Sequence, residues 1–93
     1  MRFVIMRGMP WDAGAWRAFV RAFAPMPPLI KRLAMAKMAE RVERCARQRG
    51  SGTAALEDVH RGCAEVLANK DRYMLESLLS ALQDEGYSVD EAV

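Results

Sequence analysis

The chain has 93 residues, in which 14 lysines and arginines face 12 aspartates and glutamates, for a formal net charge of +2. This length fits one small domain with a core of its own, and two cysteines are too few for a disulfide framework. No stretch approaches the roughly 18 apolar residues of a membrane span, and the apolar run at residues 3–6 is too short for a secretory signal. We therefore expect a single cytoplasmic domain, residues 1–93, that has no membrane partner.

The first ten residues favour an extended arm, because Phe3, Val4 and Ile5 are strand formers. No second strand-like run exists in the chain to pair with this arm. The arm must therefore lie across helices, pair with another copy of the chain or stay loose.

The first predicted helix covers residues 13–24. Asp12 suits its N-cap, and Trp11 has the spacing to pack on Trp16 in a hydrophobic staple. Apolar side chains then recur at helical spacing and should face the core: Trp16, Phe19, Val20 and Phe23.

The longest predicted helix runs from Pro27 and Pro28 to Gly50. Proline suits a first helical turn because the amide hydrogen that it lacks has no partner there, and glycine suits the exit because it accepts a left-handed backbone. One apolar stripe is expected to face the core, and it contains Ile30, Leu33, Ala34, Met38, Val42 and Cys45.

Two further helices are predicted, at residues 54–68 with Thr53 as N-cap and at residues 70–85 with Asn69 or Asp71 as N-cap. Gly86 should end the second of these, and Ser88 should start one last turn. The sequence thus predicts an all-α fold, a small orthogonal bundle of about four helices with a short extended N-terminal arm.

The charge is unevenly spread, since residues 28–49 hold seven cations and two acids whereas residues 69–93 hold two cations and six acids. Six cations form the polar side of the long helix: Lys31, Arg32, Lys37, Arg41, Arg44 and Arg47. They could dock an acidic protein partner or, less favoured at this modest net charge, nucleic-acid phosphates. The alternative is a solvated face on which Glu40 pairs with Arg44 and Glu43 with Arg47.

The residues most typical of a chemical site are His60, Cys63 and Cys45. His60 and Cys63 lie three residues apart on one helical face, but three donors cannot complete a closed structural zinc site. We interpret all three as packed residues, with tetrapyrrole ligation by His60 as the alternative hypothesis. No catalytic constellation is present, so we expect neither an enzyme nor a bound metal or cofactor.

Residues 11–65 resemble a known small domain. The likeness is carried by Trp11-Asp12 with Ala15, by Pro28-Leu29-Ile30, by the basic ending from Val42 to Gly50, and by residues 53–59. This pattern is similar to the protochlorophyllide reductase C-terminal domain, a helical module of the B subunit of light-independent protochlorophyllide reductase that also occurs as stand-alone proteins. The stretch before the basic ending is longer than is usual in that family, and residues 69–93 form an additional helix and tail outside the resemblance.

The resemblance implies a three-helix core and an accessory role beside a nitrogenase-like or chlorophyll-biosynthetic redox enzyme. It does not imply that this chain carries out the reduction, since two cysteines cannot supply the ligands of an iron–sulfur cluster. We therefore expect a non-catalytic interaction module with an acidic protein partner. A homodimer, formed through the N-terminal arm or the opposite charges of the two halves, is left open.

Overall fold

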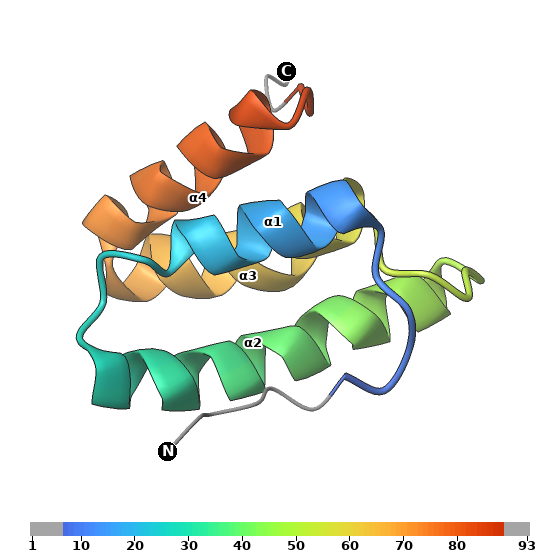
Figure 1. The fold of residues 1–93 in the computed structure, drawn as a ribbon, viewed down its shortest axis with the longest axis horizontal. Coiled ribbons are helices and arrows are strands. Elements are labelled where there is room, and N and C mark those ends of the chain that lie inside the picture. Colours follow the sequence, from blue (N-terminus) through green and yellow to red (C-terminus); the bar gives the residue numbers. More distant parts are fainter. Residues whose placement is uncertain (1–6, 89–93) are drawn as a thin grey trace.

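Residues 7–88 form four helices, α1 (Ala13–Ala22), α2 (Pro28–Gln48), α3 (Leu56–Lys70) and α4 (Arg72–Asp84). The computed structural model describes residues 7–88 (Figure 1), and no strand occurs among them. The predicted all-α bundle is therefore confirmed. No helix in this part of the chain has the length and apolar character needed to cross a membrane.

Helix α3 lies at the centre of the arrangement and packs against each of the other three helices. Helix α4 packs against α1 and α3, whereas α2 packs against α3 and runs along one side of the molecule (Figure 1). Because α2 has 21 residues and its backbone comes close to that of α3 but not to those of α1 and α4, a long face of it remains open to solvent.

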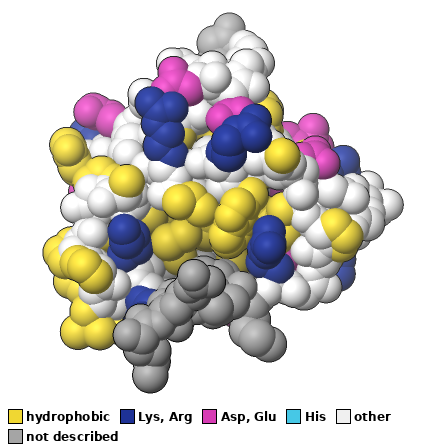
Figure 2. All heavy atoms as spheres, viewed as in Figure 1, with side chains coloured by type: hydrophobic (Ala, Val, Ile, Leu, Met, Phe, Trp, Pro, Cys, Tyr) yellow, Lys and Arg dark blue, Asp and Glu magenta, His cyan; other side chains and the backbone are white. Residues whose placement is uncertain are grey.

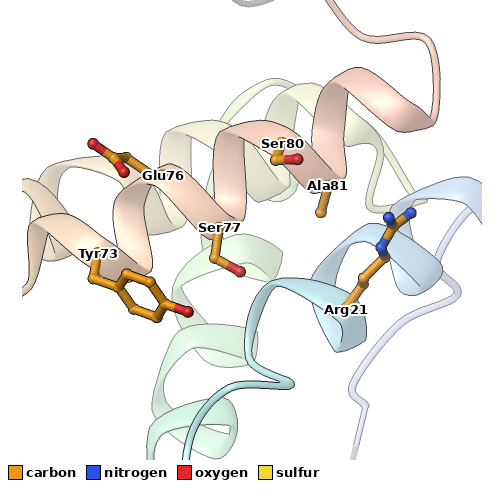
Figure 3. Close-up of a pocket in the computed structure, with 6 residues that line it drawn as sticks. All are labelled: Arg21, Tyr73, Glu76, Ser77, Ser80 and Ala81. Atoms are coloured by element: carbon orange, nitrogen blue, oxygen red, sulfur yellow. The ribbon is translucent and has the colours of Figure 1, made fainter.

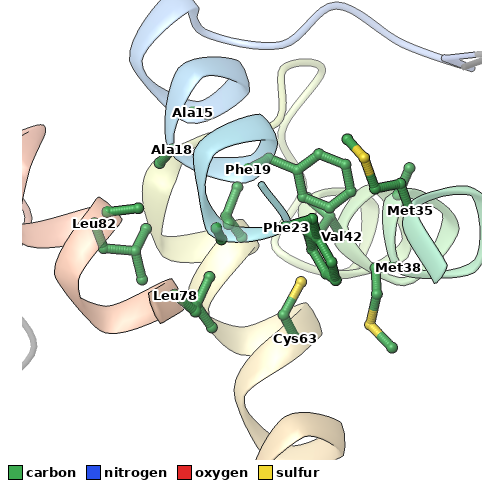
Figure 4. Packing of buried hydrophobic residues seen from close by; sticks show 14 of the residues in the cluster. Ala15, Ala18, Phe19, Phe23, Met35, Met38, Val42, Cys63, Leu78 and Leu82 are labelled. Carbon is green, nitrogen blue, oxygen red and sulfur yellow. The ribbon is translucent and has the colours of Figure 1, made fainter. Parts of the chain in front are cut away.

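The core is formed by side chains from all four helices (Figure 4). Phe19 of α1 and Phe23, which follows its last residue, are fully buried, and their rings lie 5.2 Å apart. The prediction that Val20 faces the core is wrong, since this side chain is 41% exposed. The predicted staple is present, since the rings of Trp11 and Trp16 meet edge to face at 5.2 Å. Trp11 also lies 5.0 Å from Phe19, so the segment before α1 extends the aromatic cluster.

Local sequence signals locate most helix ends correctly. Pro28 is the first residue of α2, and Gly50 and Gly86 adopt the positive φ angles of 82° and 91° that glycine tolerates best. Asp71 caps α4, because its carboxylate accepts a hydrogen bond from the Met74 amide at 3.2 Å. The first six residues of the predicted extended arm lie outside the described residues, as does most of the predicted final turn after Ser88.

The start of α3 differs from the prediction, since the helix begins at Leu56 and Thr53 does not cap it. Asp58 instead accepts a hydrogen bond from the Ala55 amide at 2.9 Å. The backbone of Ala54 pairs with the N-terminal segment, donating to the Pro10 carbonyl at 2.9 Å and accepting from the Asp12 amide at 2.8 Å. This parallel bridge anchors the described part of the arm within the same chain.

The predicted core-facing stripe of α2 is wrong in its first turns, where Ile30 is 54% and Leu33 66% exposed. The buried face of α2 instead contains Met35, Met38, Ala39, Val42, Glu43 and Ala46. Burial of Glu43 also overturns its predicted ion pair with Arg47. Its carboxylate accepts hydrogen bonds from the Gly8 amide at 3.0 and 3.1 Å and from Trp11 Nε1 at 2.8 Å.

Candidate functional site

One exposed face of α2 carries apolar residues at its start and charged residues over the rest. Spacings of three and four residues place its members on one side of the helix. These residues, called the α2 stripe below, are Leu29, Leu33, Lys37, Glu40, Arg44 and Arg47. Leu29 is 70% exposed, and Ile30 lies beside the stripe. Figure 2 shows hydrophobic side chains at the left edge of the molecule, where α2 begins.

The structure divides the six predicted cations of α2 into two sets. Lys37, Arg44 and Arg47 are exposed on the α2 stripe, and none of them forms an ion pair with a carboxylate in residues 7–88. Lys31, Arg32 and Arg41 are half-buried and lie off the stripe. Arg41 points toward α3, because its Nε donates a hydrogen bond to the Gly62 carbonyl at 2.8 Å.

A groove runs between α2 and α3 beside the stripe. Its first part is an apolar slot of about 300 Å³ lined by Phe23, Met26, Ala34, Met38, Val66 and Leu67, with Lys37, Lys70 and Asp71 at its margins. Its second part, of about 370 Å³, continues along Lys37, Met38, Glu40, Arg41, Arg44, Val66 and Lys70. The two parts share Lys37, Met38, Val66 and Lys70, so they form one continuous α2–α3 groove with an apolar floor and a mostly basic rim.

A second hollow, of about 330 Å³, lies between α1 and α4 (Figure 3). Arg21 contributes from α1, and α4 supplies Tyr73, Glu76, Ser77, Ser80 and Ala81. Two of its polar groups already have partners, since Arg21 pairs with Asp84 at 2.7 Å and the Ser77 hydroxyl donates to the Ala22 carbonyl at 2.9 Å. This hollow therefore has fewer polar groups available to a ligand than the α2–α3 groove has.

His60, Cys63 and Cys45 do not converge, because no group of three potential metal ligands occurs in the described part of the chain. Burial lowers the pKa of His60, which is therefore neutral at pH 7, and its Nδ1 lies 3.4 Å from the Tyr87 hydroxyl. Cys63 is fully buried, and desolvation raises the pKa of its thiol to about 12, so the thiol is unreactive at neutral pH.

Sequence reasoning missed the α3 side of the groove, where Val66 and Lys70 face α2. No spacing in the sequence could reveal it, because Lys37 and Lys70 come from different helices that meet only in the folded chain. No protein-family model, curated protein or solved structure matches this chain. The resemblance to the protochlorophyllide reductase C-terminal domain therefore stays a prediction from the residues alone.

Proposed function

We propose that this protein is a non-catalytic interaction module that docks onto an acidic surface of a partner protein through the α2 stripe. The observation that carries the proposal is the combination of exposed Leu29 and Leu33 with the exposed cations Lys37, Arg44 and Arg47 on one helix face. Exposed apolar side chains supply area to bury, and unpaired cations attract an oppositely charged surface.

The resemblance narrows this proposal to a cytoplasmic subunit of a nitrogenase-like or chlorophyll-biosynthetic redox enzyme as the partner. Nucleic acid is the alternative for the same cations, but Leu29, Leu33 and Glu40 on the stripe suit a protein surface better than a phosphate backbone. Tetrapyrrole binding by His60 is less favoured, since the imidazole already faces Tyr87.

Site-specific crosslinking tests the docking surface. A photo-reactive phenylalanine analogue in place of Leu33 should crosslink the partner inside cells, whereas the same analogue in place of Val20, which is 41% exposed on α1, should not. Equal crosslinking from both positions would contradict docking through α2.

Charge reversal then tests the electrostatic part with the purified partner. Lys37→Glu combined with Arg44→Glu should weaken binding by about tenfold or more, which corresponds to about 1.4 kcal/mol. Raising the salt concentration should reduce the difference between the variant and the parent chain, because exposed charges are screened. The exposed Arg61→Glu on α3 is the matched control and should leave the affinity unchanged.

A further inference from the structure

We propose that the partner presents an acidic amphipathic helix and that this helix lies in the α2–α3 groove. This inference rests on the proposed function and specifies how the partner is recognised. It differs from docking through the α2 stripe alone, because it assigns binding roles to α3 residues, above all Lys70, and to the apolar floor.

The floor of the groove can accept large apolar side chains. The slot of about 300 Å³ is lined by Phe23, Met38 and Leu67, which are at most 8% exposed, and by the half-buried Met26 and Val66. An engineered protein cavity of about 150 Å³ holds a benzene molecule, so the slot has room for about two leucine or phenylalanine side chains. Met26 and Met38 can adjust to their shape, because methionine is unbranched and flexible.

The rim specifies the charge of the occupant. Lys37 lies on the α2 wall and Lys70 on the α3 wall, and both border the slot and its continuation. Arg41 is held in place by its hydrogen bond to the Gly62 carbonyl. Of the two rim acids, Asp71 is engaged by the Met74 amide as the cap of α4. An occupant with carboxylates on both flanks of an apolar stripe matches this rim.

The walls favour a helix over an extended peptide. Both walls are helices, whose backbone groups bond internally, so the groove presents no strand edge to a peptide. An amphipathic helix satisfies its own backbone and needs only a channel for its apolar side chains. A second copy of this chain is less suitable, because Asp84 and Glu85 at the acidic end of α4 already pair with Arg21 and Arg17.

Methionine-methyl NMR of the full chain provides the test. The probe is a synthetic helical peptide with leucines at positions i, i+3, i+4 and i+7 and glutamates on both flanks. The methyl resonances of Met26 and Met38 should shift on titration, whereas those of Met35 and Met74, which lie outside the groove, should not. A matched peptide with lysines in place of the glutamates should bind at least tenfold more weakly.

Two pairs of variants locate the peptide. Ala34→Phe fills the slot and should weaken binding at least tenfold, while Ala36→Phe on the exposed side of α2 should not. Lys70→Glu leaves the core and the α2 stripe intact and should also weaken binding of the peptide, while the exposed Arg61→Glu, which lies on α3 outside both the groove and the stripe, should not. Lys70→Glu keeps the proposal testable if Ala34→Phe fails to fold.

The outcomes separate this inference from the proposed function. The proposal that the groove binds an acidic helix would be overturned if the methyl resonances of Met26 and Met38 did not shift at peptide concentrations up to about 1 mM. A dissociation constant of about 1 mM corresponds to a binding free energy of only about 4 kcal/mol. Equal binding of the lysine peptide would overturn the proposal too. If charge reversal on the α2 stripe weakens binding of the natural partner but Ala34→Phe and Lys70→Glu do not, docking through the stripe is supported and binding in the groove is contradicted. If Ala34→Phe and Lys70→Glu weaken binding of the natural partner while the photo-reactive analogue in place of Leu33 crosslinks nothing, binding in the groove is supported and docking through the stripe is contradicted.

Discussion

At the scale of single residues, Glu43 holds the N-terminal segment against the bundle. It is 6% exposed, and its carboxylate accepts the Gly8 amide and the Trp11 indole N–H. Trp11 contacts both Trp16 and Phe19, so the hydrogen bond from Trp11 to Glu43 also helps to position the aromatic cluster. A buried carboxylate is tolerated here because its two oxygens accept hydrogen bonds from two N–H donors, the Gly8 amide and the Trp11 indole.

Glu43→Ala should therefore lower the free energy of unfolding by about 1–3 kcal/mol, since it leaves the half-buried Trp11 indole N–H without its acceptor. Urea unfolding followed by tryptophan fluorescence measures the change. Glu40→Ala removes the same side chain from the exposed face of α2 and serves as control, with an effect within about 0.5 kcal/mol. Equal losses for the two variants would show that the Glu43 hydrogen bonds do not stabilise the fold.

No sequence pattern identifies this role of Glu43. Spacing from Arg47 suggests an ordinary ion pair on a solvated helix face, whereas the actual donors come from Gly8 and Trp11, 35 and 32 residues earlier in the chain. Such a contact depends on where the N-terminal segment crosses α2. Local propensity contains no information about that crossing.

At the scale of helices, Gly62 permits the close approach of α2 and α3. A Cβ atom at this position would lie 2.8 Å from the Val42 Cα and 2.9 Å from the Val42 backbone nitrogen. Neither atom can move without shifting α2 itself. The α2–α3 groove therefore depends on a glycine that also slightly weakens α3.

Gly62→Ala should destabilise the protein, although alanine is favoured over glycine within a helix by about 1 kcal/mol. Overpacking costs about 1–3 kcal/mol, and a clash with backbone lies at the upper end of that range, so the net change should be a loss. Urea midpoints measure it, with Gly52→Ala as control because nothing lies within 4 Å of a Cβ built there. A higher midpoint for Gly62→Ala would show that α2 and α3 have space to separate.

The helices themselves were largely predictable, whereas the orientation of α2 was not. Prolines, glycines and an N-cap aspartate are local signals, and they located Pro28, Gly50, Asp71 and Gly86 correctly. The register of α2 failed because Ala39 and Ala46 carry little hydrophobic signal, yet their small side chains form the buried face. Ile30 and Leu33 carry a stronger signal and lie at the exposed start of the helix, which explains why the apolar part of the candidate site was missed.

At the scale of the whole molecule, internal ion pairs partly neutralise the acid-rich half of the chain, but within residues 7–88 they do not involve the α2 stripe. Arg17 and Arg21 of α1 pair with Glu85 and Asp84 at 2.8 and 2.7 Å, and Arg49 at the end of α2 pairs with the fully buried Asp58. The cations of the α2 stripe have no such partners within residues 7–88. The charge gradient along the sequence thus becomes an exposed, mostly basic face of α2.

The same charge distribution predicts that stability falls as the pH falls. Burial lowers the pKa of His60 below its ordinary 6.5, so the unfolded chain binds this proton more readily than the folded one. Desolvation by itself would raise the pKa of Asp58, but hydrogen bonds from Arg49 and the Ala55 amide outweigh it, and the net pKa lies below 3.8. The hydrogen bond from Arg17 likewise lowers the pKa of Glu85 below 4.5.

In each case the unfolded state binds more protons, so the free energy of unfolding decreases with decreasing pH. The His60 contribution should be lost from about pH 6.5 downward, and those of Glu85 and Asp58 from about pH 4.5 downward. Urea unfolding at pH 3 to 8 measures both steps. His60→Gln should remove the first step and leave the second, whereas a parent chain whose stability rises between pH 7 and 5.5 would contradict a lowered pKa of the half-buried His60.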